Sequence, residues 1–352
     1  MAEMLADPAS PAWDTIRRMA LAGVTLTGID PPGVLAGGRL WLRGEGVPPL
    51  PSPEVAVSVG GAPARVVFAA PDRVAVEVPA GSASGRLPVR ASWSPGATLF
   101  VDVGEVLAAG LHQVDSPVRD REGYIYSAFS GPRGQETPVS VYRVGRDGGR
   151  EAWVEGIVNA TSLTLAPNGD LFVSSRYDGV VYRVFDDGRR EAFASELGVA
   201  CGLAFAPDGA LFVGDRTGTI HRVSADGARA EIFAILPSSV AAFHLAVGPD
   251  GMLYVTGPTL ATHDAVRRFD SSGRGEVLDH TFGRPQGLAF DEHGVLHVVE
   301  ALAGVSAIYR MPAGGPKRAV VCGPGLVGVA FGPAGECVAA TSDALYRFTV
   351  RP

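Results

Sequence analysis

The sequence predicts an all-β protein, on the evidence of a recurring unit, of the turn residues within that unit and of its apolar stretches. Each unit has an apolar stretch, a tight glycine turn, a second apolar stretch and a tetrapeptide with Arg at its third position. Successive turn glycines are 46, 40, 42, 43 and 41 residues apart. A period in the forties is typical of four strands per unit. The six turn glycines are Gly123, Gly169, Gly209, Gly251, Gly294 and Gly335.

The clearest copies run from Ser162 to Ala194 and from Gly202 to Ala234. Asn or Asp before Gly suits a two-residue hairpin turn, and the flanking Leu, Phe, Val and Tyr suit extended backbone. The stretches LAF, LFV and LYV are apolar at nearly every position, which indicates strands covered on both faces. Four-stranded blades stacked face to face around an axis meet that condition. We therefore predict a six-bladed β-propeller over residues 104–352.

The last copy stops at Phe348 without a fourth strand, so the ring needs a closing strand from elsewhere. The outer strands of the other copies begin with patterns such as EAWV and EAFA, and a matching EVLA stands at Glu105 to Ala108. We predict that this upstream segment supplies the missing outer strand and closes the ring.

A different module precedes the propeller. Valines alternate with smaller or polar residues in VAVSV from Val55 and in VAVEV from Val74, as in strands with one buried face. Turns recur about every dozen residues, so we predict an immunoglobulin-like β-sandwich over residues 24–103. Residues 1–23 form an N-terminal segment, in which Trp13 to Leu21 predicts a short amphipathic helix.

Composition excludes several classes. Thirty Lys and Arg against 37 Asp and Glu give a net charge of −7 without a basic block, which argues against nucleic acid or an anionic membrane as the partner. Three cysteines without a CxxC pair indicate reduced thiols in a cytoplasmic protein. No signal peptide or membrane span is expected. The sequon at Asn159 would matter only in a secreted protein.

The repeats act as an internal control, because a residue present in every copy is structural and one that differs between copies is free to be functional. Each copy carries one arginine in its third strand, which we expect to pair locally or to cover apolar surface. These arginines are Arg143, Arg183, Arg222, Arg268, Arg310 and Arg347.

The copies differ where the innermost strands enter the axis. The equivalent residues are Asp115, Thr161, Cys201, Phe243, Gln286 and Val327, and His244 stands where the neighbouring position holds Ser or Gly. A buried histidine is more often a hydrogen-bonded core residue than a catalyst, so both interpretations of His244 stay open. The loops after the second strands add charges around one mouth of the ring: Arg133, Arg176, Asp215, Arg216 and Glu300. A solvated face with salt bridges is the alternative to a ligand site there.

Two family resemblances rest on particular residues. Residues 24–104 resemble the IPT/TIG immunoglobulin-like family through Ile29-Asp30-Pro31-Pro32, Gly37-Gly38 and Val78-Pro79. The likeness implies a spacer or an interaction surface. Residues 104–352 resemble the six-bladed NHL and SMP-30/gluconolactonase-like propellers through the blade sequences.

In the lactonase branch of that family, the resemblance implies a divalent metal on the axis, held by a Glu and by Asn and Asp residues. Here Asp115 replaces the Glu, and Cys201 and Gln286 stand where Asn or Asp is expected. One carboxylate with Thr161 and Gln286 makes a poor calcium cage. We therefore expect no metal and no cofactor, with a calcium ion as the alternative.

Two functions remain open. The first is a protein that binds a small polar molecule or a protein partner in the axial funnel, through Thr161, Cys201, Gln286 and the charged mouth. The second is a lactonase-like hydrolase of a lactone or ester, with Asp115 and His244 as acid and base. Cys201 as a nucleophile with His244 as its base competes with a buried structural thiol. The sequence contains no HExxH, P-loop or GxSxG motif.

Overall fold

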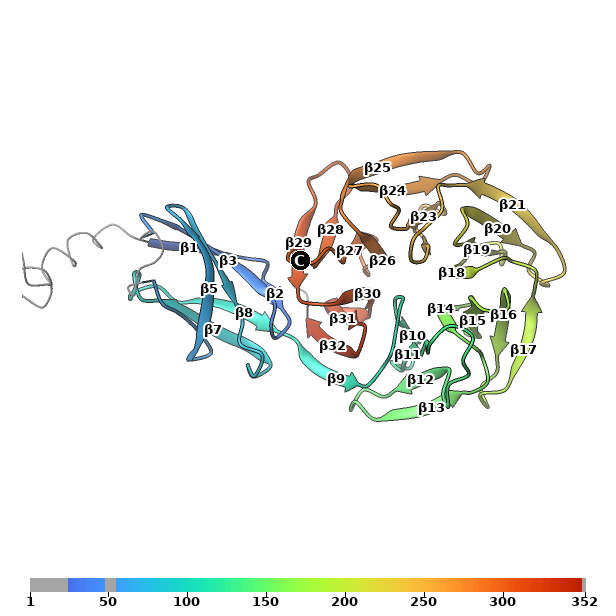
Figure 1. The fold of residues 1–352 in the computed structure, drawn as a ribbon, viewed down its shortest axis with the longest axis horizontal. Helices are drawn as coiled ribbons and strands as arrows, with labels where there is room; N and C mark the ends of the chain where they lie inside the picture. The colour runs from blue at the N-terminus through green and yellow to red at the C-terminus, as the bar shows by residue number, and fades with distance from the viewer. Residues whose placement is uncertain (1–24, 48–54, 350–352) are drawn as a thin grey trace, which may run out of the picture. The chain divides into compact units, whose positions relative to one another are not determined.

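The computed structural model describes residues 25–47 and 55–349, which form two compact units (Figure 1). The first contains the described residues up to Gly104 together with Val321–Gly323, and the second contains residues 105–320 and 324–349. The helix expected at Trp13 to Leu21 lies outside the described residues. The one helical segment within the described ranges is the 3₁₀ turn Pro333–Gly335.

The first unit is all-β, but it does not divide into the two separate sheets expected of a sandwich. Its strands follow one another in the order β1-β3-β6-β5-β4-β7-β8-β2. The long strand β5 pairs with β4 at its start and with β6 along the rest of its length, so it joins what would otherwise be two sheets. The strands are β1 Thr25–Asp30, β2 Gly33–Val34, β3 Arg39–Glu45, β4 Val57–Val59, β5 Ala62–Ala70, β6 Arg73–Glu77, β7 Gly85–Ala91 and β8 Leu99–Val103.

The alternation that predicted a one-sided core is present in β4 but not in β6, where Val74, Ala75 and Val76 are all buried. Strand β3 shows the one-sided pattern as well. Leu40 and Leu42 on β3 are buried, while Arg39, Trp41 and Arg43 between and beside them are exposed. Val57 and Val59 point inward in the same way. Trp93 is among the largest fully buried side chains. Burying such residues supplies the hydrophobic stabilisation of a small domain, at roughly 25 cal/mol per Å² of apolar surface.

The second unit is a β-propeller in which five four-stranded sheets stand by themselves. Within each sheet, neighbouring strands are antiparallel, and the outer strands β13, β17, β21 and β25 lie on the rim of the ring in Figure 1. The first three sheets contain β10 Val118–Arg119, β11 Ile125–Ala128, β12 Val141–Val144, β13 Arg150–Val154; β14 Ala160–Leu165, β15 Leu171–Ser175, β16 Val180–Val184, β17 Arg190–Ala194; and β18 Ala200–Phe205, β19 Leu211–Asp215, β20 Thr219–Val223, β21 Ala230–Ile235.

The remaining strands complete the list. The fourth sheet contains β22 His244–Val247, β23 Leu253–Thr256, β24 Asp264–Phe269 and β25 Gly275–Phe282, and the last contains β30 Leu326–Phe331, β31 Glu336–Thr341, β32 Ala344–Thr349 and β9 Glu105–Ala109. Between them in sequence come β26 Pro285–Phe290, β27 Leu296–Glu300, β28 Ala307–Met311 and β29 Arg318–Cys322.

The prediction of six separate blades is therefore corrected to five. The strands β26–β29 do not form a sheet of their own, because the end of β29 belongs to the first unit. There, Val321 pairs with Gly33 and Cys322 pairs with Val34 in parallel register. The sequence could not show this, because two-residue β2 carries no strand pattern.

The predicted closing strand is confirmed. Strand β9 pairs antiparallel with β32, with Ala109 opposite Ala344 and Glu105 opposite Arg347. Leu107 and Ala108 enter a core shared with Leu345 and with Ile125 of the first sheet. Gln113, buried just after β9, donates to the carbonyls of Thr341 and Ala344 and accepts from Ser127 Oγ at 2.6 Å.

Local pairing of the blade arginines is confirmed for five of the six. Each forms an ion pair across the sheet with a glutamate on the outer strand, as Arg143 does with Glu151 at 2.7 Å and Arg347 with Glu105 at 2.8 Å. The other three pairs are Arg183 with Glu191, Arg222 with Glu231 and Arg268 with Glu276. Opposite charges placed across two strands contribute roughly 0.2–1 kcal/mol each, so these arginines belong to the scaffold.

Aromatic rings fill the spaces between sheets and explain why the second strands are apolar throughout. Phe172 on β15 contacts Phe193 and Phe205, each with ring centroids 4.9 Å apart. Phe212 and Tyr254 take the same place on β19 and β23, since each lies opposite the blade arginine of the next strand. No helix among the described residues is long and apolar enough to cross a membrane.

His297 breaks this aromatic series, because it lies opposite Arg310 where Phe172, Phe212 and Tyr254 stand in other sheets. Its Nδ1–H donates to the carbonyl of Val295 at 3.1 Å, and its buried Nε2 has no hydrogen-bond partner among the described residues. Burial lowers the pKa of His297 to about 4.

Replacing His297 by Phe should stabilise the protein in mild acid. Between the ordinary histidine pKa near 6.5 and about 4, the unfolded chain takes up a proton that the folded chain does not, so falling pH destabilises the native state. At pH 5 the loss is about 2 kcal/mol. Urea unfolding at pH 7 and pH 5 should show a smaller pH dependence for His297→Phe, and wild-type dependence for the exposed-site control His293→Gln. An unchanged dependence in His297→Phe would show that His297 is not the group that titrates.

Candidate functional site

Asp115 and His244, the predicted acid and base, form a direct hydrogen bond. Asp115 precedes β10 and His244 opens β22, so 129 residues separate them in sequence. Asp115 Oδ1 lies 2.5 Å from His244 Nδ1, and both side chains are buried. The backbone N–H of Ser116 donates to the same carboxylate oxygen at 2.6 Å. The bond therefore joins the innermost strands of two sheets that are not neighbours in the chain.

This contact fixes the chemistry available to the imidazole. A carboxylate accepts hydrogen bonds only, so Nδ1 carries the proton when His244 is neutral and Nε2 is left as an acceptor. An aspartate that orients a histidine in this way is the arrangement found where histidine acts as a general base. The same contact also satisfies two buried polar groups, as a purely structural pair would.

The inner strands approach one another closely around this pair. A Cβ added to Gly328 would lie 2.4 Å from the Cα of Ser116, and one added to Gly287 would lie 2.7 Å from the Cα of Gly328. Only glycine allows that approach, because backbone atoms cannot move aside as a side chain can. The inner strands are therefore packed backbone against backbone next to Asp115.

Thr161 and Cys201 lie buried at the equivalent positions of the second and the third sheet, respectively. Thr161 Oγ1 donates to the carbonyl of Asn159 at 2.8 Å, which leaves its hydroxyl without a free proton. Burial raises the pKa of the Cys201 thiol to about 12, with Arg176 opposing the shift and Asp115 adding to it. A thiol that stays protonated at neutral pH is a poor nucleophile, so the geometry favours the structural interpretation of Cys201.

Three arginines from three successive loops gather near Cys201. Burial lowers the pKa of half-buried Arg176, and the charges of Arg216 and Arg133 lower it further. None of the three has an ion pair among the residues that the structure describes, unlike five of the six blade arginines. The loops also touch, since a Cβ on Gly134 would lie 3.0 Å from the ring of Tyr177.

Asn159 positions the loop that carries Arg133. It is completely buried with φ of 51°, and its side chain accepts from the backbone N–H of Gly134 and donates to the carbonyls of Gly131 and Pro132. Asparagine tolerates this left-handed conformation better than most residues. In the sequence Asn159 stands out only as part of a sequon, although the long first loop indicates that some residue must anchor it.

Two of the predicted ligand-binding acids serve the loops instead. Asp215 accepts from the backbone N–H groups of Val199 and Thr217 and from the Thr217 hydroxyl. Glu300 accepts from the backbone N–H groups of Gly283, Arg284 and Leu302 at 2.6 to 2.9 Å. Both are buried, and their oxygens are occupied by the chain itself. Gln286 is half-buried, and its carbonyl accepts from Thr256 Oγ1 at 2.5 Å, which ties β26 to the fourth sheet.

The axial residues do not fit the divalent cation that the lactonase branch would hold. Asp115 is the one carboxylate among the six entry positions, and its Oδ1 is already shared by His244 and Ser116. Calcium takes six to eight oxygen ligands. Among the described residues, no group of three or more His, Cys, Asp or Glu is placed to share a metal.

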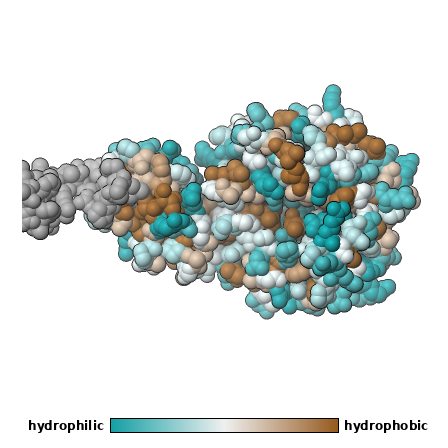
Figure 2. Space-filling model, viewed as in Figure 1, coloured by the Kyte–Doolittle hydropathy of each residue, from teal (hydrophilic) through white to brown (hydrophobic). Residues whose placement is uncertain are grey.

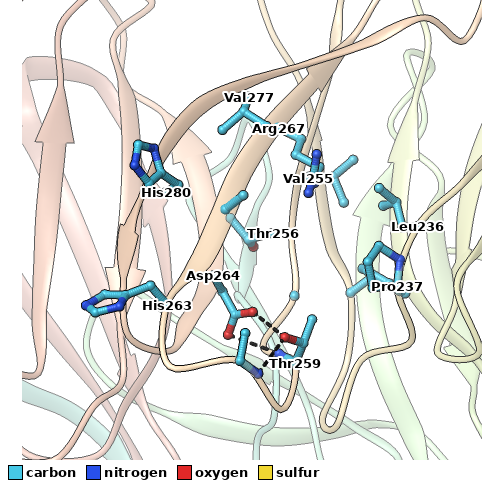
Figure 3. A pocket seen from close by; sticks show the side chains of 14 residues that line it. Leu236, Pro237, Val255, Thr256, Thr259, His263, Asp264, Arg267, Val277 and His280 are labelled. Carbon is cyan, nitrogen blue, oxygen red and sulfur yellow. Dashed lines mark hydrogen bonds between the residues drawn. The ribbon is translucent and has the colours of Figure 1, made fainter.

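A pocket that the sequence did not predict lies beside the fourth sheet. It has a volume of about 280 Å³ and is lined by residues of the linker before β22, the loop before β24 and strands β23, β24 and β25 (Figure 3). His263, Asp264, Arg267 and His280 are its polar residues with titratable side chains. A signal was present in the sequence, since the fourth copy has a longer loop after its second strand than the second and third copies, and its outer strand has eight residues where those of the first three have five or six.

Solved structures support the fold. A gluconolactonase from Xanthomonas campestris superposes with a TM-score of 0.57 at 13% identity, covering 70% of this chain and 89% of the other. An auxiliary nutrient binding protein from Bacteroides thetaiotaomicron gives a TM-score of 0.54 at 11% identity and covers 98% of this chain and 99% of the other. An inactive virginiamycin B lyase from Staphylococcus aureus, crystallised with quinupristin, gives 0.52 at 13% identity over 94% and 96%.

These similarities establish an all-β propeller fold and no more, because every identity is below 25%. No family model matches the sequence. No curated protein matches it either.

The three cysteine thiols should resist alkylation in the folded protein. All three are buried and unpaired, and burial raises each pKa to about 12. Native protein treated with iodoacetamide at pH 8 should stay unmodified by mass spectrometry, and protein in guanidinium should gain three adducts. Leu260→Cys, at a residue 94% exposed, should be modified at once and serves as the control. Rapid modification of Cys201 in the native protein would contradict the structural interpretation.

Proposed function

We propose that the propeller binds a small anionic molecule, such as a sugar acid or another polar carboxylate, at the mouth above the axis. The observation that carries the proposal is the group of Arg133, Arg176 and Arg216: the charges of Arg133 and Arg216 lower the pKa of half-buried Arg176, and none of the three has an ion pair among the described residues. In a protein of net charge −7, three cations held together by separate loops repel one another unless an anion joins them.

The chemistry of arginine sets the ligand class. Its planar guanidinium donates two parallel hydrogen bonds to a carboxylate or phosphate, and hydrogen bonds to charged groups contribute roughly 1.5–3 kcal/mol each. Asn159 holds the Arg133 loop and Asp215 holds the Arg216 loop, so the cations are positioned before the ligand arrives. Preorganisation of this kind reduces the entropy cost of binding.

Although only five sheets stand by themselves, we propose that β26–β28 fill the place of a sixth blade in the ring. Strands β26 to β28 repeat the antiparallel order of the free-standing sheets, and β26 packs beside both β22 and β30. The funnel then has six walls, with Gln286 on one of them. For the first unit we propose an immunoglobulin-like module of the IPT/TIG type that acts as a spacer or an interaction surface. For the whole chain we propose a cytoplasmic location.

A lactonase-like hydrolase is the second candidate, favoured by the Asp115–His244 contact. A neutral His244 oriented by Asp115 offers Nε2 as a proton acceptor for a water that attacks a lactone carbonyl. The arginines would then stabilise the carboxylate that ring opening produces. The gluconolactonase from Xanthomonas campestris shares the fold with this chain, and its activity makes lactones the first substrates to test.

Removing one cation from the cluster should weaken anion binding. We expect D-gluconate or inorganic phosphate to bind the wild-type protein, and Arg176→Gln to lower the affinity at least about 10-fold, equivalent to 1.4 kcal/mol. The matched control Arg183→Gln removes an arginine of the same sheet that has carboxylate partners and should change the affinity less than about 2-fold. Isothermal titration calorimetry measures both. Equal affinities for Arg176→Gln and wild type, or no binding of either anion, would contradict the proposal.

The hydrolase candidate has its own test. Wild-type protein should open D-glucono-1,5-lactone in a pH-stat, and Asp115→Asn with His244→Gln should reduce kcat by roughly 10²–10⁴, the usual contribution of a general base. Circular dichroism checks that the double variant remains folded. Activity that survives the double change excludes these two residues as acid and base. If the wild-type protein binds gluconate but opens no lactone, the hydrolase function is excluded and only the binding function remains.

A further inference from the structure

The residue before each blade arginine differs in the fourth sheet. It is a tyrosine in four copies, namely Tyr142, Tyr182, Tyr309 and Tyr346. His221 takes this position in the third sheet and Arg267 takes it in the fourth. Every copy forms the same kind of strand at this position. A change of residue type before the blade arginine therefore changes how the space between two sheets is filled and leaves the strand intact.

Tyrosine fills that space in the first two sheets. Tyr142 packs against the core that includes Leu107 and Ile125, and Tyr182 packs against the core between the first and second sheets. A guanidinium covers each ring from the outer strand, with Arg150 4.7 Å from Tyr142 and Arg190 5.5 Å from Tyr182. The tyrosine ring and the guanidinium together fill the space between the sheets.

Both members of that arrangement are changed in the fourth sheet. Arg267 replaces the tyrosine, and Gly275, opposite Phe269, replaces the arginine that stands opposite Val144 or Val184 elsewhere. The third sheet also has both members changed, to His221 and Ala230, whereas in the fourth sheet the 280 Å³ pocket lies beside Arg267, at the position that a tyrosine takes in other copies. Its size is just below the range of roughly 300–1,000 Å³ that is usual for small-molecule sites.

The walls of the pocket differ in character. Figure 3 shows His263 and His280 on one side and Leu236 and Pro237 on the other, with Arg267 at the same end as Val277. Phe243, Val255 and Ala265 add further apolar lining. A bound molecule would therefore meet an apolar wall along one side and hydrogen-bond donors along the other.

The one carboxylate in the pocket is already engaged. Asp264 is buried and accepts from the backbone N–H of Thr259 at 3.0 Å and from its hydroxyl at 2.6 Å, as the dashed lines in Figure 3 show. Arg267 has no ion pair with Asp264 or with any other described residue. Its positive charge at the other end of the pocket is therefore available to a ligand.

Exposed apolar side chains stand next to lining residues in the sequence or belong to the lining. Leu260 is 94% exposed, Ile235 is 76% exposed, and Val277 in the lining itself is 47% exposed. Figure 2 shows exposed hydrophobic side chains as brown areas among hydrophilic ones on the larger unit. The apolar residues of the lining, half-exposed Val277 among them, favour a ligand that is itself partly apolar.

We propose that this pocket binds a small amphipathic monoanion, such as a medium-chain or aromatic carboxylate, with its carboxylate on Arg267 and its apolar part against Leu236, Pro237 and Val255. His263 and His280 add hydrogen-bond donors along the polar side. The site is separate from the arginine cluster at the mouth of the axis, so the two sites can be tested independently.

Octanoate is a suitable probe, with 1-octanol as its uncharged counterpart. Wild-type protein should bind octanoate at least about 10-fold more tightly than 1-octanol by isothermal titration calorimetry. Arg267→Tyr restores the residue of four other copies, so it should fold normally, fill the pocket and abolish binding of both compounds. Arg267→Gln keeps the space and removes the charge, so it should lose the preference for octanoate and retain 1-octanol.

Two controls identify the site. His221→Tyr makes the same restoration in the third sheet and should leave octanoate binding unchanged. Arg176→Gln should also leave octanoate binding unchanged, because Arg176 belongs to the separate arginine cluster at the axis and not to the pocket. Octanoate binding that survives Arg267→Tyr, that is lost in Arg176→Gln, or that is missing in wild type would overturn the proposal.

Discussion

Closure of the ring by β9 is the constraint on which the rest of the propeller depends. Without it, β32 would be an unpaired edge strand next to the first sheet, and unpaired edges invite association with other chains. The pairing also places Leu107 and Ala108 in the core between the last sheet and the first. Gln113, which directly follows, fixes the chain at the point where it turns toward the axis, so Asp115 reaches its position because the closure is in place.

Much of the propeller could be predicted because its strands carry local signals. The glycine turns, the apolar second strands and the arginine with its glutamate opposite all lie within one copy, and the EVLA segment resembles its counterparts closely enough to be recognised at a distance. The predicted number of separate blades was wrong because it depends on a pairing between strands far apart in the sequence. Two residues of β2, Gly33 and Val34, determine that β29 is shared with the first unit, and two residues cannot form a pattern.

The site could be predicted only in part. Comparing the copies brought out Asp115 and His244, because residue type at an entry position can be read directly, and the structure joins them. The same comparison could not distinguish Arg176 from Asp215, since both are charged loop residues. What separates them is hydrogen bonding: the carboxylate of Asp215 is taken by Val199 and Thr217, whereas Arg176 has no ion pair among the described residues. The pocket at Arg267 could not be predicted, because the sequence shows the changed residue but not the empty space beside it.

Asn159 has a consequence for how the chain is made. It lies in a sequence that oligosaccharide transfer enzymes accept, yet its side chain is fully buried and all its polar atoms bond to the loop that carries Arg133. Transfer of a glycan takes place on unfolded chains, before burial can protect the amide. A copy produced through a eukaryotic secretory route would therefore receive a sugar that the folded ring has no room for, and the first loop would be unable to close.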